Sequence, residues 1–320
     1  MNGKEHAKIA NSPEPLAMTD PSGSKVSTAA PAAADNGAAD CRNADNPERP
    51  PSLPSWARLS INRCNLPAVV LGGLTFQRHP TPLLLDGVAE LHADLFALLD
   101  GESDTTVRAR FFRDALAAHF CLDRLEEAGL TAGHDRRAKA NWLRILRGWS
   151  FDTDGREGAV LKGWVESRFG LLPRFHGEPL RDFTGPAYRR YQEMRSTGLS
   201  GTNALESQLD LLYTFCQYEF ARAGRGRSAT GDVILYRGIN RVGDYEMLPG
   251  DDSRKVVLFN NLASFSKNRE RADEFGDTIL EVRVPTPKIF FHCGLLPSLL
   301  IGEDEYLVIG GAYEVAISSH

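Results

Sequence analysis

Hydrophobic and polar positions follow two different repeats in the two halves of the chain. Between residues 86 and 222 the apolar side chains recur at steps of three and four, the period of a helix packed by one face. From residue 230 onward the apolar runs are short, rich in β-branched and aromatic residues, and bounded by Gly, Pro, Asn or Asp, which is typical of strands. The pattern predicts an α+β protein, with a helical N-terminal half packed on a mostly antiparallel sheet.

The helical half divides into several predicted helices. Two of them are marked by apolar stripes, which consist of Val88, Leu91, Leu95 and Leu98 and, further on, of Phe112, Leu116 and Phe120. Two more are expected over residues 136–149 and 156–169, because an Asp-containing turn with a glycine, residues 152–155, separates them. The tryptophans of this half, Trp142, Trp149 and Trp164, are expected in the core.

The clearest predicted helix covers residues 203–222. Asn203 and Glu206 form the pattern of a capping box at its start. One face is apolar and consists of Leu205, Leu209, Leu212, Cys216 and Phe220. We therefore expect this face to lie against the core.

Six strands are expected in the second half of the chain. They cover residues 233–236, 255–259, 278–284, 288–291, 305–309 and 312–317. A short helix is expected between the second and third strands, over residues 268–275, with Ala272 and Phe275 facing inward.

The first 55 residues have a different composition from the rest. Ala, Pro, Ser, Asn, Asp and Gly dominate there, and too few large apolar side chains are present to offset the entropy cost of ordering the segment. We expect a disordered tail over residues 1–55 and one domain over residues 56–320. The helical part of that domain is expected over about residues 80–225 and the β-rich part over about residues 230–320.

Composition and charge argue against several classes of function. The net charge of -5 at pH 7 disfavours nucleic acid as the main partner. The five cysteines are scattered, and His292 beside Cys293 has no partner at metal-ligand spacing, so we expect reduced thiols and no metal site. No segment has the length of an apolar membrane span or the core of a signal peptide, which favours a cytoplasmic protein.

Residues suited to catalysis stand beside three of the predicted strands, namely Arg237 and Gly238, Ser264 and Ser266, and Glu303 and Glu305. An arginine fork can bind a pyrophosphate, and hydroxyls can bind a ribose or steady a carboxylate. A carboxylate beside a ribose stabilises the positive charge that builds when the glycosidic bond breaks. The set therefore predicts a protein that splits NAD and hands on its ADP-ribose, with Glu305 as the catalytic residue.

Glu303 points to the same side as Glu305 if the segment is extended, because strand side chains repeat every second residue. A second carboxylate on that face can receive the guanidinium of an acceptor. The pair therefore suggests that an arginine is the modified residue.

The order Arg, Ser-x-Ser, Glu-x-Glu resembles the Arg-Ser-Glu class of mono-ADP-ribosyltransferases, which modify arginine in several members. The resemblance implies a β-sandwich ADP-ribosyltransferase core with NAD as the substrate. It implies that Arg237 anchors NAD, that Gly238 lies against the nicotinamide amide and that Ser264 supports both, while Glu303 serves the arginine acceptor and Glu305 is catalytic. Phe265 departs from the threonine of many members but leaves both serines in place.

From about residue 56 onward the chain also resembles the dinitrogenase reductase ADP-ribosyltransferase family of nitrogen-fixing bacteria, including the helical half and the run LLIGEDEY at residues 299–306. This resemblance implies that ADP-ribose passes from NAD to one arginine of dinitrogenase reductase, the nitrogenase iron protein, and reversibly inactivates nitrogenase. It also implies a PII signalling protein as the activating partner.

Three alternatives remain open at this point. The transferase could act on another protein, or water could take the place of arginine, which would make the protein an NAD glycohydrolase. The same residues could also form a catalytically silent module that recognises a nucleotide or a partner.

Overall fold

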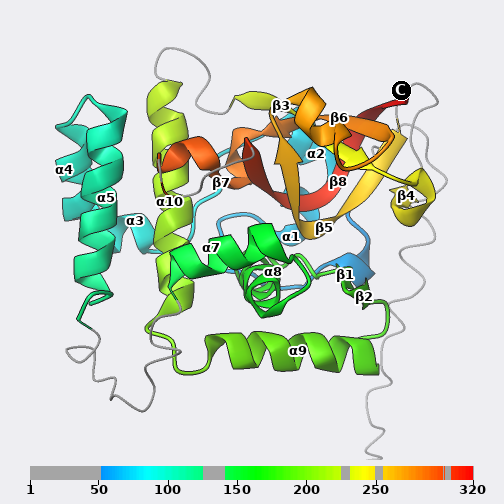
Figure 1. Cartoon of the computed structure of the whole chain (residues 1–320), viewed down its shortest axis with the longest axis horizontal. Helices are drawn as coiled ribbons and strands as arrows, with labels where there is room; N and C mark the ends of the chain where they lie inside the picture. Colours follow the sequence, from blue (N-terminus) through cyan, green and yellow to red (C-terminus); the bar gives the residue numbers. More distant parts are fainter. Residues whose placement is uncertain are drawn as a thin grey trace, which may run out of the picture. The chain divides into compact units, whose positions relative to one another are not determined.

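A computed structural model describes residues 52–124, 141–224, 231–248, 255–297, 299 and 304–319, and these residues belong to one compact unit (Figure 1). Its helices are α1 (Ala68–Leu71), α2 (Leu74–Arg78), α3 (Val88–Leu91), α4 (Ala93–Asp100), α5 (Thr105–His119), α7 (Trp142–Phe151), α8 (Arg156–Phe169), α9 (Pro186–Leu199), α10 (Leu205–Ala223) and α11 (Arg269–Asp273). Its strands are β1 (Phe175–His176), β2 (Glu178–Pro179), β3 (Asp232–Ile239), β4 (Glu246–Leu248), β5 (Lys255–Ser266), β6 (Thr278–Pro285), β7 (Ile289–His292) and β8 (Glu305–Ser319). The α+β prediction is confirmed. Apart from residues 52–55, the predicted tail lies outside the described residues.

The long described strands form one six-stranded sheet in the order β4-β5-β3-β6-β8-β7, and every pairing in it is antiparallel. β5 also pairs with β8. The pairings β5 with β3, β3 with β6, β6 with β8 and β8 with β5 therefore close a circuit. A sheet with such a circuit cannot lie flat, so the two layers expected of a sandwich are parts of one curled sheet.

The two predicted strands 305–309 and 312–317 are a single strand, β8, that runs through Gly310 and Gly311. A Cβ at Gly310 would lie 1.8 Å from the carbonyl oxygen of Asn260, and Gly311 has φ of +120° and lies against Gly72. β5 is also longer than predicted, because it continues past Asn260 through a bulge between Phe259 and Leu262. Glycine and asparagine therefore mark a bend in paired strands here rather than the ends of strands.

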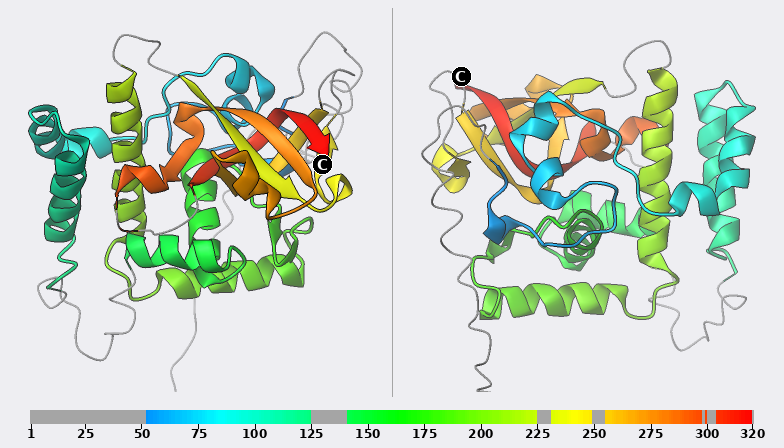
Figure 2. Two further views of the ribbon diagram at one scale, coloured as in Figure 1. Left: turned by 45° about the horizontal axis from the view of Figure 1, so that its top comes forward. Right: turned by 180° about the vertical axis from the view of Figure 1, so that it is seen from behind.

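α8 is the central helix, and 11 of its 14 residues are buried. Its bounds agree with the predicted helix 156–169. α9 packs along one side of α8 and β5 along another, and both contacts can be followed in Figures 1 and 2. Trp142, Trp149 and Trp164 are buried as predicted, with exposed fractions of 5%, 2% and 0%.

α10 lies between β7 and the pair α4 and α5 (Figure 2). Phe112 of α5 stacks on Phe215 of α10 with ring centroids 4.0 Å apart, and Arg108 pairs with Glu219 at 2.7 Å. Phe112 and Leu116 are buried, as the apolar stripe predicts.

The predicted stripe from Val88 to Leu98 is wrong in part. The helix breaks at His92, which ends α3 and begins α4, so residues on either side of it do not share one face. Leu91 and Leu98 are 74% and 54% exposed, and Leu99 is the fully buried residue of α4.

The predicted capping box of α10 is also wrong. The helix begins at Leu205 after Ala204, which adopts a left-handed conformation, and no side chain caps it. The Asn203 amide instead donates to the carbonyl oxygen of Phe120. The predicted apolar face is otherwise correct, because Leu205, Leu209, Leu212 and Cys216 are buried and Phe220 packs against the core from a partly exposed position.

Two other helices are shorter than predicted. α7 begins at Trp142, where Asn141 caps it by accepting from the Arg144 amide at 3.0 Å, and residues 136–140 lie outside the described part of the chain. α11 ends at Asp273. Ala272 is buried as predicted, but Phe275 lies beyond the helix and is 59% exposed, so its predicted inward position is wrong.

Among the described helices, none combines the length and the apolar character needed to cross a membrane.

Candidate active site

Glu305, the predicted catalytic residue, is the first residue of β8 and lies opposite Ser266 of β5 in the strand register. Its side chain is partly buried. Its backbone is held from the other side by Cys293, since the Glu305 amide donates to the Cys293 sulfur at 3.3 Å and the thiol is 3.4 Å from the Glu305 carbonyl oxygen. The carboxylate therefore projects from a fixed point of the sheet.

Ser264 connects the three predicted strand ends. Its hydroxyl donates to Oε1 of Glu305 at 2.7 Å, and its carbonyl oxygen accepts from Nη1 of Arg237 at 2.5 Å. Arg237 is thus tied to Glu305 through one intervening residue. The structure brings together the arginine, the serine and the glutamate that the sequence singled out.

Arg237 has a second partner that the sequence analysis missed. Its Nε donates to the Tyr245 hydroxyl at 3.0 Å, and its guanidinium carbon lies 5.9 Å from the centre of the Phe265 ring. Within the described residues Nη2 makes no hydrogen bond. A guanidinium held along one side in this way fits the expected binding of the pyrophosphate of NAD.

Helix α7 contributes two further side chains that the sequence analysis did not place in the site. The indole Nε1 of Trp149 donates to the Ser264 hydroxyl at 2.9 Å, and the Ser150 hydroxyl donates to Oε2 of Glu305 at 2.8 Å. Both oxygens of the carboxylate are thus bound by hydroxyls that come from different elements. Nothing in the helical spacing of residues 142–151 distinguishes these two positions from core and surface positions of any other helix.

Gly238 and Ser266 have structural contacts of their own. A Cβ at Gly238 would lie 1.9 Å from the carbonyl oxygen of Ala272, so only glycine lets α11 approach β3 this closely. The Ser266 hydroxyl accepts from the Asn268 amide at 3.0 Å and so orders the turn into α11. Their expected contacts with NAD stay predictions. Glu303 lies outside the described residues.

His292 packs between two aromatic rings. It lies between Phe220 and Tyr306, with ring centroids 5.3 and 5.2 Å away. Burial, helped by the charge of Lys267, lowers the pKa of His292 to about 4, so the ring is neutral at physiological pH. No cluster of three metal-binding side chains occurs within the described part of the chain.

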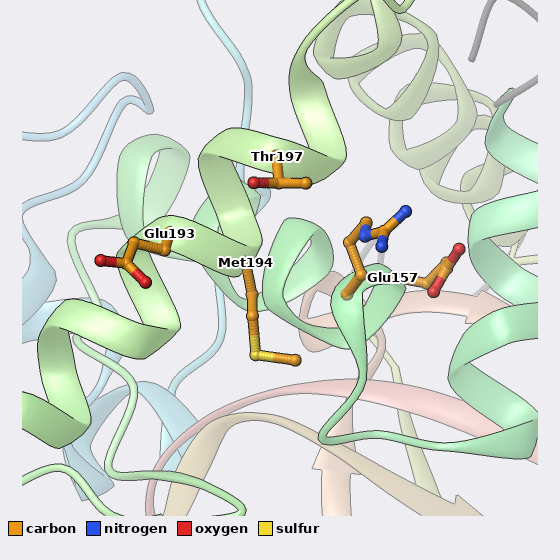
Figure 3. A pocket seen from close by; sticks show the side chains of 5 residues that line it. Glu157, Glu193, Met194 and Thr197 are labelled. Carbon is orange, nitrogen blue, oxygen red and sulfur yellow. The ribbon is translucent and has the colours of Figure 1, made fainter. Parts of the chain in front are cut away.

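A hollow on the surface between α8 and α9 has no residue in common with the Glu305 cluster (Figure 3). It is lined by Arg156, Glu157, Glu193, Met194 and Thr197. It is wide open to solvent and lacks the convergent buried polar groups of a catalytic pocket.

On this curled antiparallel sheet an arginine, a serine and a glutamate meet, joined through the serine, which is the arrangement expected of a mono-ADP-ribosyltransferase of the Arg-Ser-Glu class. The family model of dinitrogenase reductase ADP-ribosyltransferase (DRAT) matches residues 61–317. The chain belongs to this family.

One curated relative agrees with this assignment. The chain is 44% identical over 264 residues to the NAD(+)--dinitrogen-reductase ADP-D-ribosyltransferase of Rhodospirillum rubrum. The aligned region covers 81% of this chain and 95% of the relative. A search of solved structures gave no match.

Proposed function

We propose that this protein transfers ADP-ribose from NAD to one arginine of dinitrogenase reductase and thereby inactivates nitrogenase reversibly. The observation that carries the proposal is the connected set Arg237, Ser264 and Glu305, in a chain that belongs to the DRAT family. The substrate follows from the name of the Rhodospirillum rubrum relative.

The contacts of Glu305 fit the stabilisation of positive charge on a ribose. An ionised carboxylate has about four lone-pair directions, and the hydroxyls of Ser264 and Ser150 occupy one on each oxygen. The other directions remain for the ribose. Because the two serines hold the carboxylate in advance, little reorganisation is needed when the charge develops.

The transfer itself exchanges one bond for another. The bond between the ribose C1′ and the nicotinamide nitrogen breaks, and its electron pair leaves with nicotinamide. A nitrogen of the acceptor arginine forms the new bond to C1′ and loses a proton. We assign the binding of that guanidinium, and the acceptance of its proton, to Glu303.

Regulation and location belong to the proposal as well. The resemblance to the DRAT family supports a PII signalling protein as the activating partner and the cytoplasm as the place of action. Adding PII protein to the enzyme, dinitrogenase reductase and NAD should raise the rate of transfer.

The test compares Glu305→Gln, Glu303→Gln and, as a control, Glu274→Gln, whose carboxylate is exposed and pairs with Arg271 three residues away. Nicotinamide release and labelling of dinitrogenase reductase are measured with labelled NAD. E305Q should lose both reactions by a factor of about 100 or more, because the charge opposite the ribose is gone. E303Q should keep nicotinamide release but lose the labelling of protein, and E274Q should behave as the wild type.

Each alternative gives a different result. Equal nicotinamide release with and without dinitrogenase reductase, and no labelled protein, would identify an NAD glycohydrolase. A single labelled band of another size in an extract of nitrogen-fixing cells would identify another target. If no nicotinamide is released under any condition, the protein is a catalytically silent binding module.

A further inference from the structure

The end of helix α7 reaches the catalytic carboxylate from the helical half of the molecule. Trp149 and Ser264 are separated by 115 positions in the sequence, and Ser150 and Glu305 by 155. The two α7 side chains follow one another in the sequence, yet they contact opposite ends of the same hydrogen-bonded pair. One helix end therefore borders both the serine and the glutamate.

We propose that Trp149 and Ser150 are positioning residues of this active site, through which α7 fixes the orientation of the Ser264 hydroxyl and of the Glu305 carboxylate. The inference rests on the proposed function, since it assigns these residues to the reaction at Glu305. Neither residue belongs to the Arg, Ser-x-Ser, Glu-x-Glu pattern.

The direction of the hydrogen bonds at Ser264 follows from the donors present. An indole nitrogen can only donate, so the Ser264 hydroxyl must accept from Trp149. A serine hydroxyl has a single hydrogen, which then points away from the indole. Glu305 is the acceptor at 2.7 Å, and the tryptophan therefore turns Ser264 into a donor aimed at the carboxylate.

Trp149 is itself held in place by its surroundings. Its ring is 2% exposed, and the Lys162 ammonium lies 5.9 Å from the ring centre. Asp154 holds that ammonium at 2.8 Å. A Cβ at Gly148 would lie 2.4 Å from the Glu157 side chain, so α7 is packed closely on α8. The indole nitrogen is thus presented to Ser264 by a rigid neighbourhood.

Ser150 uses its single hydrogen for the carboxylate rather than for its own helix. A serine inside a helix often bonds the carbonyl oxygen four residues earlier, which here is that of Leu146 at 3.3 Å. Oε2 of Glu305 is closer, at 2.8 Å, and a carboxylate oxygen is the stronger acceptor. Ser150 therefore restrains the rotation of the carboxylate that Ser264 alone would permit.

Loss of either positioning contact should lower kcat strongly and should change the affinity for NAD only a little. Small displacements of a catalytic group cost up to about 100-fold in rate. Arg237, the expected anchor of NAD, is held instead by the Tyr245 hydroxyl and the Ser264 carbonyl oxygen, which neither substitution removes. Trp149→Phe removes the N–H donor and part of the ring volume but keeps an aromatic ring, and Ser150→Ala removes only the hydroxyl. We expect each to lower kcat about 10- to 100-fold with KM for NAD little changed.

The chain offers matched controls for both substitutions. Trp164 is equally buried and donates its indole N–H to Asp210 at 2.7 Å, so Trp164→Phe deletes a comparable bond that does not involve Glu305. The Ser167 hydroxyl donates to a carbonyl oxygen of its own helix and accepts from Arg168 at 2.6 Å, and Ser167→Ala removes both bonds without touching Glu305. Both control variants should keep the wild-type kcat. Ser150→Thr keeps a hydroxyl and should restore most of the rate lost in S150A.

A double variant separates positioning from packing. If Trp149 acts through Ser264, adding W149F to Ser264→Ala should lower kcat no further than S264A does alone. A second measurement is independent of catalysis. The indole N–H resonance of Trp149, assigned by its absence from the NMR spectrum of W149F, should shift in S264A and not in S167A.

The inference is overturned if W149F and S150A turn over NAD at the wild-type rate, if W164F loses as much activity as W149F, or if the effects of W149F and S264A multiply. An unshifted Trp149 resonance in S264A would overturn it even for an inactive protein. Failure of the proposed function has a different signature, since the wild type itself would then release no nicotinamide or label no protein.

Discussion

Lys288 is fully buried within the described core and has no carboxylate partner there. Its ammonium donates to the carbonyl oxygens of Leu71 at 2.9 Å and Gly310 at 2.5 Å, and it lies 5.9 Å and 5.5 Å from the ring centres of Phe76 and Tyr313. Burial lowers the pKa of Lys288 to about 7. The lysine thus links α1 to the bend of β8, at an energetic cost that depends on pH.

We predict that Lys288 makes the protein more stable as the pH rises from 7 to 8.5. In that range the lysine of the unfolded chain, with a pKa near 10.5, still binds a proton that the folded protein has released, so unfolding becomes less favourable with increasing pH. The slope should reach about 1.4 kcal/mol per pH unit at most. Urea unfolding of the wild type and of Lys288→Met at pH 7 and at pH 8.5 measures this slope.

The comparison with Lys288→Met contains its own control. Met carries no titrating group, so its free energy of unfolding should lack this slope. Cys64 lies nearby, and burial raises the pKa of its thiol, but Cys64 is present in both proteins and is therefore not the difference between them. Equal slopes in the two proteins would show that Lys288 stays protonated in the fold.

At the scale of single residues, the sequence identified those members of the site that differ in kind from their surroundings. Arg237, Ser264 and Glu305 are polar residues at the ends of apolar strands, and the structure joins them as expected. Trp149 was predicted only as a core residue and Ser150 was not singled out. Their part depends on a contact between distant segments, which no local pattern records.

Among the elements, α10 begins with an unfavourable backbone conformation. Ala204 has φ of 46° and ψ of 40°, a left-handed conformation that costs a residue with a Cβ about 1–2 kcal/mol. The amide of Gln208 donates to its carbonyl oxygen at 3.1 Å, so the helix holds Ala204 there. Glycine adopts this conformation without steric cost.

We therefore expect Ala204→Gly to stabilise the protein. The gain should be about 0.5–1 kcal/mol, which corresponds to a rise in Tm of about 1–4 °C for a domain of this size. Thermal unfolding followed by circular dichroism measures it. Ala221→Gly, an exposed position inside the same helix, is the matched control and should lower Tm, because glycine there costs about 1 kcal/mol.

The sequence predicted the type of most elements better than their ends. α8 has the bounds expected of it, since a turn precedes it and Gly170, in a left-handed conformation, ends it. β8 was predicted as two strands, because its glycine pair has low strand propensity. Pairing with β5 and the close approach of Gly72 outweigh that preference, and neither can be seen along the chain.

At the scale of the whole molecule, buried histidines make the fold sensitive to acid. His176 and His292 each have a pKa lowered to about 4, in both cases mainly by burial, and His92 has a pKa lowered by burial and by His119. Between pH 6.5 and 4 the rings of His176 and His292 bind a proton in the unfolded chain but not in the fold. These histidines therefore leave the free energy of unfolding unchanged above pH 6.5 and lower it as the pH falls below 6.5.

We predict that His292→Phe reduces this acid sensitivity. Phenylalanine can keep the ring contacts with Phe220 and Tyr306 but binds no proton. Between pH 6.5 and 5 the free energy of unfolding of the wild type should fall more steeply than that of H292F, by up to about 1.4 kcal/mol per pH unit. Parallel curves from urea unfolding would contradict the lowered pKa of His292.

The closure of the sheet could not be predicted from the sequence. The spacing of apolar residues indicates which segments are strands but not that β5 pairs with β3, β4 and β8 together. Such closure depends on strand twist and on the bulge in β5, which are properties of the assembled sheet. The order of the elements along the chain predicts the α+β class of the fold. It does not predict which strands pair with one another.

The distance along the chain between α7 and its partners also has a consequence for the time of synthesis. A ribosome that adds about 5–20 residues per second needs about 8–30 s to pass from Ser150 to Glu305, 155 positions later. During that interval the helix end has no carboxylate to hold. With the role proposed for Glu305, a nascent chain that lacks β8 cannot split NAD, so the enzyme stays inactive until this strand has been made.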